Sequence, residues 1–136
     1  MSTANNEVYL GRSGGTDTIY LLDCSRSMGD KLGETRVSKL EIAKAVMVST
    51  LSAASYGPSD RVGMLAVSTN LFSKPIIREV IPLAEVLPLL QSNALPFDRI
   101  MYLKHDGGTA LTAGIFESLR AYSSKSSSKD LNVVVI

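Results

Sequence analysis

Four short, mostly apolar runs mark the chain, at residues 18–22, 61–67, 76–81 and 131–136. The first two runs are almost wholly apolar, which is typical of strands that are buried on both faces of a parallel sheet. The third run lies between Lys74-Pro75 and Pro82, and proline cannot donate a hydrogen bond to a neighbouring strand. We therefore expect the third strand to lie at an edge of the sheet.

A long helix is predicted after the first strand, because Ser38 and Glu41 form the S-x-x-E pattern of a capping box. Apolar residues then recur at steps of three and four, which places them on one face. The helix should end near Gly57-Pro58, where glycine permits a left-handed cap and proline prevents continuation. The apolar face consists of Leu40, Ala43, Met47 and Leu51.

A second helix is predicted over residues 110–122, with Leu111, Ile115 and Leu119 forming the face that packs. A short helix is expected within residues 83–90, although Pro88 forces a kink or a late start. No clean period is found in residues 92–104, which we interpret as an irregular connection.

The order of these elements predicts an α/β fold with a mostly parallel sheet and right-handed crossovers. The length of 136 residues fits one domain. Residues 1–16 are polar and are expected to form a flexible arm, whereas residues 17–136 are expected to form the domain. The serine-rich segment 123–129 is predicted to be a solvated loop.

Composition excludes several functional classes. The formal net charge is +1 without a long basic run, which argues against nucleic acid as a partner. No apolar stretch is long enough for a membrane span, and the N-terminus lacks the apolar block of a secretory signal, so we expect a cytoplasmic protein. Cys24 is the only cysteine, so neither an internal disulfide nor a thiolate zinc site can form.

Candidate chemistry begins where the first strand ends. Asp23 stands at the carboxyl end of that strand, and Ser25 and Ser27 follow at alternate positions. Thr109 follows Gly107-Gly108, which would let the backbone approach closely. Ligands of open α/β sheets bind beyond the carboxyl ends of the strands, and a loop there could turn these oxygens toward one point. One carboxylate and three hydroxyls suit Mg²⁺, Mn²⁺ or Ca²⁺.

A cation held by a single carboxylate keeps about one net positive charge by simple counting. It would therefore seek a further carboxylate, which an aspartate or glutamate of a partner protein could supply. This reasoning predicts metal-dependent binding of an acidic partner.

The run Asp23-Cys24-Ser25-Arg26-Ser27 resembles the D-x-S-x-S of the metal-ion-dependent adhesion site in von Willebrand factor A (VWA) domains. Gly107-Gly108-Thr109 resembles the second loop of that site, and residues 38–44 and 60–67 resemble the helix and strand between them. The resemblance implies a three-layer, Rossmann-like sheet flanked by helices, with Asp23, Ser25, Ser27 and Thr109 holding the ion directly or through water. It also implies a non-enzymatic adaptor, with an AAA+ ATPase as a plausible partner.

The chain departs from this family at its end. Members usually carry a further site aspartate after the fourth strand, in a loop that often reads T-D-G, and this chain stops at Ile136. The resemblance therefore implies an incomplete VWA fold, truncated after the fourth strand, whose last strands are missing. The fourth strand would form an exposed apolar edge, which invites self-association.

Other interpretations of the same residues stay open. Thr109 could serve only as a helix N-cap, Asp106 could replace the missing carboxylate, and Arg26 could steer acidic partners or simply be solvated. Asp23 could instead be the nucleophile of a Mg²⁺-dependent phosphoryl-transfer enzyme, although Ser25 stands where a general acid would be needed. A third interpretation is a scaffold domain with a vestigial site. His105 is expected at the surface, and the Cys24 side chain in the core.

Overall fold

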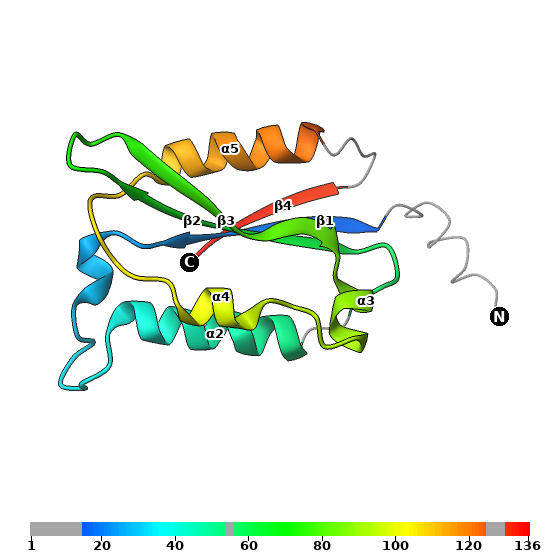
Figure 1. Ribbon diagram of the computed structural model, residues 1–136, viewed down its shortest axis with the longest axis horizontal. Coiled ribbons are helices and arrows are strands. Elements are labelled where there is room, and N and C mark those ends of the chain that lie inside the picture. Colours follow the sequence, from blue (N-terminus) through cyan, green and yellow to red (C-terminus); the bar gives the residue numbers. More distant parts are fainter. Residues whose placement is uncertain (1–14, 54–55, 125–129) are drawn as a thin grey trace.

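A computed structural model describes residues 15–53, 56–124 and 130–136, and it shows one four-stranded sheet with helices on both faces (Figure 1). The strand order is β3-β2-β1-β4. β1 pairs in parallel with both β2 and β4, whereas β3 runs antiparallel to β2. The predicted α/β fold with a mostly parallel sheet is confirmed. The strands are β1 (Thr16–Asp23), β2 (Arg61–Thr69), β3 (Pro75–Glu85) and β4 (Asp130–Val135).

The predicted arm at residues 1–16 lies outside the described residues except for Gly15 and Thr16, and Thr16 already belongs to β1. Residues 125–129 of the predicted serine-rich loop also lie outside them, and Ser123 and Ser124 belong to the preceding helix. No helix in the described part of the chain is long and apolar enough to cross a membrane.

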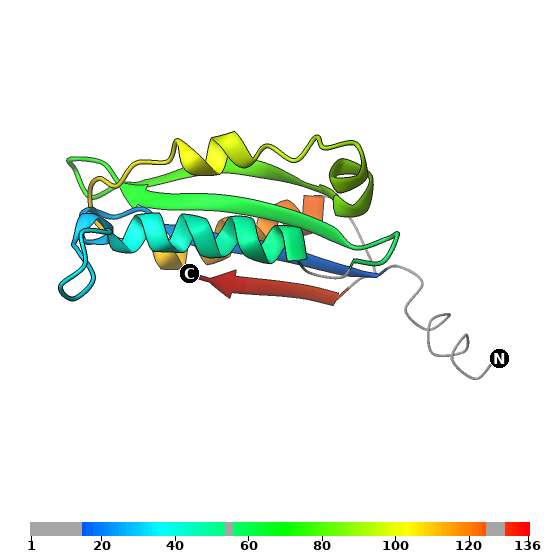
Figure 2. The same ribbon diagram turned by 90° about the horizontal axis from the view of Figure 1, so that it is seen from below.

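The first long helix, α2 (Lys39–Ala53), begins as the capping box predicts, because the Glu41 amide donates a hydrogen bond of 3.1 Å to Ser38 Oγ. The four residues of its predicted apolar face are all buried. They pack with Leu22 and Cys24 of the β1 end in the larger part of the core. Figure 2 shows α2 running along the sheet, with β4 at the margin.

The helix on the opposite face, α5 (Leu111–Ser124), packs differently from the prediction. Ile115 and Leu119 are exposed by 40% and 46%, whereas Gly114 and Ser118 are buried. A Cβ added to Gly114 would lie 2.8 Å from Val67 Cγ1, so the small residue lets the helix approach the sheet closely. The expected stripe of Leu111, Ile115 and Leu119 was wrong because close packing here depends on small side chains, which a hydrophobic pattern does not mark.

β3 is an edge strand as predicted, but it continues through Pro82 to Glu85. Its register with β2 shifts between Val62 and Met64 and again between Met64 and Leu65, which is where Pro82 and its neighbours lie opposite. Such an irregularity accommodates a residue that lacks an N–H. Residues 83–85, which were predicted to be helical, are therefore extended. The short helix α3 (Val86–Gln91) starts late, with Pro88 in its first turn, where no intrahelical donor is required.

The segment 92–104 was predicted to be irregular, but it contains the short helix α4 (Phe97–Met101), which packs against α2. Five residues are too few to show a helical period in the sequence. Ile100 is fully buried, and Lys44 Nζ of α2 donates a hydrogen bond of 2.8 Å to the Met101 carbonyl. Lys44 is thereby buried with its charge directed at a backbone acceptor.

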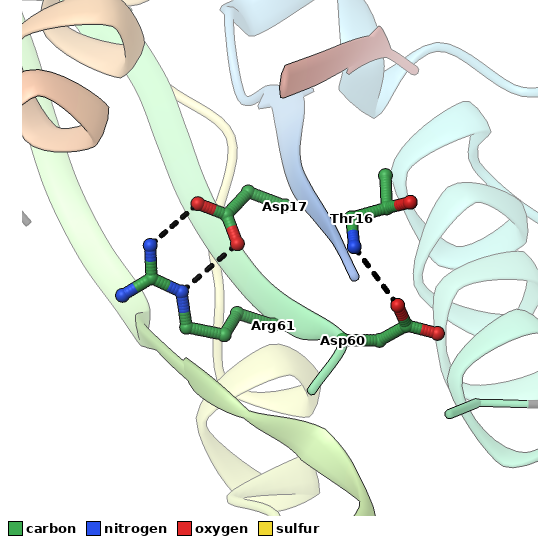
Figure 3. Close-up of polar contacts among 4 residues, drawn as sticks. All are labelled: Thr16, Asp17, Asp60 and Arg61. Carbon is green, nitrogen blue, oxygen red and sulfur yellow. Dashed lines mark hydrogen bonds and ion pairs between the residues drawn. The ribbon is translucent and has the colours of Figure 1, made fainter. Parts of the chain in front are cut away.

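A buried ion pair joins β1 to β2 at the end of the sheet where β1 begins (Figure 3). Asp17 is fully buried, and its two carboxylate oxygens accept hydrogen bonds of 2.9 Å from Arg61 Nε and 2.6 Å from Arg61 Nη2. Nearby, the Thr16 amide donates to Asp60 Oδ1 at 2.9 Å. This paired geometry satisfies both charges and fixes the start of β1 beside the start of β2.

Candidate functional site

The loop that follows β1 gathers three oxygen-bearing side chains. Asp23 Oδ1 accepts a 2.8 Å hydrogen bond from the Ser25 amide, which turns the backbone sharply after the strand. Ser25 Oγ and Ser27 Oγ lie 3.3 Å apart. Ser25 is buried, Asp23 is half-buried, and Ser27 is exposed at the start of the 3₁₀ turn η1 (Arg26–Gly29). The alternate spacing therefore places the two hydroxyls within reach of each other.

The loop that leads into α5 lies directly beside the first loop. The Arg26 amide donates to the Gly107 carbonyl, and the Asp106 amide donates to the Cys24 carbonyl, both at 2.8 Å. In Figure 1 these two loops lie at the same end of the sheet as the turn between β2 and β3. Two segments far apart in the sequence are thus joined by backbone hydrogen bonds at the carboxyl end of β1.

Glycine is required in the second loop by the close approach of β2. Gly107 has a φ of +70°, and a Cβ there would lie 1.8 Å from the Thr69 carbonyl oxygen. The Gly108 amide donates a hydrogen bond of 2.6 Å to Thr69 Oγ1. The two glycines therefore permit the close backbone approach that the sequence suggested, and the segment they contact is the end of β2.

Thr109 is exposed two residues after Gly107. Within the described part of the chain, no hydrogen bond joins its side chain to Asp23, Ser25 or Ser27. The first helical residue of α5 is Leu111, which puts Ala110 rather than Thr109 at the N-cap position. The structure thus brings the loop of Thr109 to the site without showing a contact between its hydroxyl and the three other side chains.

Arg26 and Asp106 form an exposed ion pair across the two loops, with Arg26 Nη2 3.7 Å from Asp106 Oδ1. The same oxygen of Asp106 accepts a hydrogen bond of 2.8 Å from the Gly107 amide. Both contacts keep the Asp106 carboxylate engaged within its own loop and with Arg26. A surface pair of this kind adds about 0–1 kcal/mol to stability.

Cys24 is buried on the α2 side of the sheet, as the alternation along β1 predicted. Burial raises the pKa of its thiol to about 11, and the negative charge of Asp23 acts in the same direction. The positive charges of Lys44 and Arg78 oppose this rise in pKa. The thiol is therefore a buried packing group that stays protonated at neutral pH.

His105 is exposed, as expected, but its ring also packs against the first loop. A Cβ added to Gly29 would lie 2.4 Å from His105 Cε1, so the ring lies directly against the Gly29 backbone and would have to move if a side chain were added there. The sequence carried no sign of this contact, because both residues lie in loops without any periodic pattern. Gly29 and His105 thus form a further contact between the two loops.

The oxygen donors of the first loop fit a hard divalent cation. Two ligands of Mg²⁺ at about 2.1 Å and at right angles lie roughly 3 Å apart, close to the separation of the two serine hydroxyls. No cluster of three or more His, Cys, Asp or Glu side chains that could hold a metal occurs among residues 15–53, 56–124 and 130–136. Any cation at this site would therefore depend on hydroxyls together with the single carboxylate of Asp23.

No protein-family model matches the sequence, and no curated protein matches it. Similar solved structures include a von Willebrand factor type A protein from Catenulispora acidiphila, 18% identical with a TM-score of 0.66 over 88% of this chain. The conserved hypothetical protein BatB from Bacteroides thetaiotaomicron is 19% identical, with a TM-score of 0.64 over 89% of this chain. An uncharacterized membrane-spanning protein from Vibrio fischeri is 16% identical, with a TM-score of 0.60 over 82%.

The chain shares the fold of these structures. It covers 25% of the Catenulispora acidiphila chain and 52% of each of the other two, so it spans about half of their length or less. At these sequence identities the likeness concerns the fold alone. The VWA-like, Rossmann-like architecture that the sequence resemblance implied is thereby borne out.

Proposed function

We propose that this chain is a protein-interaction module that binds a carboxylate of a partner through a divalent cation held by Asp23, Ser25, Ser27 and Thr109. The observation that carries the proposal is the pair of hydrogen-bonded loops at the carboxyl end of β1. The first loop carries one carboxylate and two adjacent hydroxyls, and backbone hydrogen bonds hold the loop of Thr109 beside it in a VWA-like fold.

The residues of the chain have distinct tasks in this proposal. The hydrogen bond from the Ser25 amide holds the Asp23 carboxylate in place, and the 3.3 Å contact orients Ser25 Oγ and Ser27 Oγ together. Arg26 is exposed at the rim, where its positive charge attracts acidic groups. Mg²⁺ is the preferred cation, ahead of Mn²⁺ or Ca²⁺. When bound, it would keep a net positive charge, and an aspartate or glutamate of the partner would complete its coordination.

The class of partner follows from this chemistry and from the resemblance. An acidic protein segment is the expected ligand, and an AAA+ ATPase remains our proposal for the protein that carries it. Self-association through β4 is a second proposed contact, since β4 lies at the margin of the sheet with Val134 and Val135 exposed by 39% and 46%.

Calorimetric titration of Mg²⁺ and Mn²⁺ into wild type and Asp23→Asn tests cation binding. Asparagine keeps an oxygen that can accept the Ser25 amide hydrogen bond but removes the charge, so we expect affinity to fall by about tenfold or more. Asp98→Asn, which changes an exposed aspartate in α4, is the matched control and should bind like wild type. Negligible heats in all three proteins would favour a scaffold with a vestigial site.

Acetate serves as the probe for the partner's carboxylate. In a two-dimensional NMR titration, acetate should shift the amide signals of residues 23–29 only when Mg²⁺ is present. Turnover of a generic phosphate ester that Asp23→Asn abolishes would instead establish the phosphoryl-transfer alternative.

A further inference from the structure

A cavity of about 470 Å³ opens beside the candidate cation site, on the α2 side of the sheet. Its floor includes Cys24 and Ala66, which belong to the core on that side. Arg78 pairs with Ala66 across β2 and β3, and directly paired residues of neighbouring strands present their side chains on the same face. The remaining wall comes from the loop that follows α4, including Lys104 and His105.

The cavity carries positive charge that the described residues do not neutralise. Arg78 and Lys104 line it, and no carboxylate of residues 15–53, 56–124 or 130–136 lies within 4.0 Å of either. Asp106 is the acidic residue in the lining, and its Oδ1 is already engaged by Arg26 and by the Gly107 amide. Among these described residues, neither Arg78 nor Lys104 therefore forms an ion pair.

A further positive charge lies close to the lining of the cavity. Lys44 of α2 is buried, and its Nζ donates a hydrogen bond of 2.8 Å to the carbonyl of Met101, which directly precedes the lining residues Tyr102 and Leu103. Positive charge therefore lies near the cavity on α2 as well as on β3.

We propose that this cavity is a binding site for a small organic anion that carries a carboxylate or phosphate group. Arg78 and Lys104 provide charged donors from two sides, and the hydroxyls of Ser68 and Tyr102 provide neutral ones. A volume of this size holds a small molecule, and the Cys24, Ala66 and Leu103 side chains offer apolar contact to its carbon skeleton. None of these side chains belongs to the proposed cation ligands, so the two sites can be tested separately.

Titration of the folded chain with inorganic phosphate and with citrate, followed by two-dimensional NMR, tests the proposal. The buffer is freed of metals on a chelating resin, so that no anion binds through a cation. We expect saturable shifts at Arg78 and at residues 103–106 with either anion. Sodium chloride at matched ionic strength should not reproduce them, because screening alone produces no saturable local shift.

The variant Arg78→Gln with Lys104→Gln should weaken binding of both anions by about tenfold or more, since it removes both charged donors. Both residues are exposed, so the change should leave the fold intact, which thermal unfolding checks. Arg99→Gln removes an exposed arginine of α4 that does not line the cavity, and it should bind like wild type.

Two results would overturn the proposal. The first is the absence of saturable shifts with phosphate and with citrate in the wild-type chain. The second is equal anion affinity in the wild type and in the folded double variant. Binding of citrate alone or of phosphate alone, with loss in the double variant, supports the site and tells which group it prefers.

Discussion

Cys24 lies between two candidate cation ligands in the sequence, yet its side chain is buried and the pKa of its thiol is raised to about 11. At pH 8 only about one thiol in a thousand is then ionised, compared with roughly a quarter for an ordinary cysteine. We expect alkylation by iodoacetamide at pH 8 to be at least about a hundredfold slower in the folded chain than in guanidinium. The stability that the buried neutral thiol contributes is present below about pH 8.5 and is lost as the pH rises through 11.

An exposed thiol in the same fold provides the control for this prediction. The variant Cys24→Ala with Ser52→Cys places the only cysteine on the exposed side of α2. It should be alkylated at nearly the rate of the unfolded chain. If wild-type Cys24 reacts as fast as this variant, the thiol is not buried as the structure shows.

Single residues differ in how far the sequence could place them. The burial of Cys24 and the grouping of Asp23, Ser25 and Ser27 follow from a strand with period two and from the alternate spacing beyond it. The packing of His105 against Gly29 depends on where two loops meet, which no local pattern encodes. The position of Thr109 relative to Asp23 also depends on how these two loops meet, so the role of Thr109 as a ligand stays a prediction.

At the scale of elements, the second site loop depends on one glycine. Gly107→Ala would add a Cβ 1.8 Å from the Thr69 carbonyl oxygen, at a φ of +70°. The loop or the end of β2 must then move, and we expect a loss of about 2–3 kcal/mol in the free energy of unfolding, measured by urea denaturation. Cation affinity should fall as well, if the second loop contributes a ligand.

Gly33→Ala separates the effect of the backbone angle from that of the clash. Gly33 also has a positive φ, of 58°, but a Cβ there would meet no atom within 4 Å. This variant should lose only about 1 kcal/mol, the cost of a non-glycine residue in the left-handed region. Equal losses in the two variants would show that the contact between Gly107 and Thr69 is not tight.

The elements that the sequence placed correctly are those with a repeated signal. α2 has both a capping box and an apolar stripe, and its start and its buried face agree with the prediction. The predicted end of β3 was wrong because proline usually ends a strand. An edge strand can contain a proline such as Pro82 where its pairing with the neighbouring strand is irregular. The position of α5 in the chain was predicted correctly, but the face that packs against the sheet was not. That face contains the small residues Gly114 and Ser118.

At the scale of the whole molecule, the sheet could be predicted because its central strands β1 and β2 each contain an unbroken apolar run, at residues 19–22 and 62–67. Their parallel pairing follows from the helix between them. The buried pair of Asp17 and Arg61 was not foreseen, because the two residues are far apart in the sequence and a strand-end aspartate is usually solvated. The buried ion pair of the sheet thus involves charged residues without a local sequence pattern.

The buried pair of Asp17 and Arg61 joins β1 to β2 away from the candidate site (Figure 3). Asp17→Asn removes the carboxylate charge that forms the ion pair with the Arg61 guanidinium, whose side chain is only 15% exposed. We expect the free energy of unfolding to fall by about 3–5 kcal/mol, measured by urea denaturation. The control is Glu117→Gln, which removes the partner of Arg120 in an exposed ion pair on α5 and should cost less than about 1 kcal/mol. A loss for Asp17→Asn no larger than that of the control would mean that the pair does not hold the two central strands together.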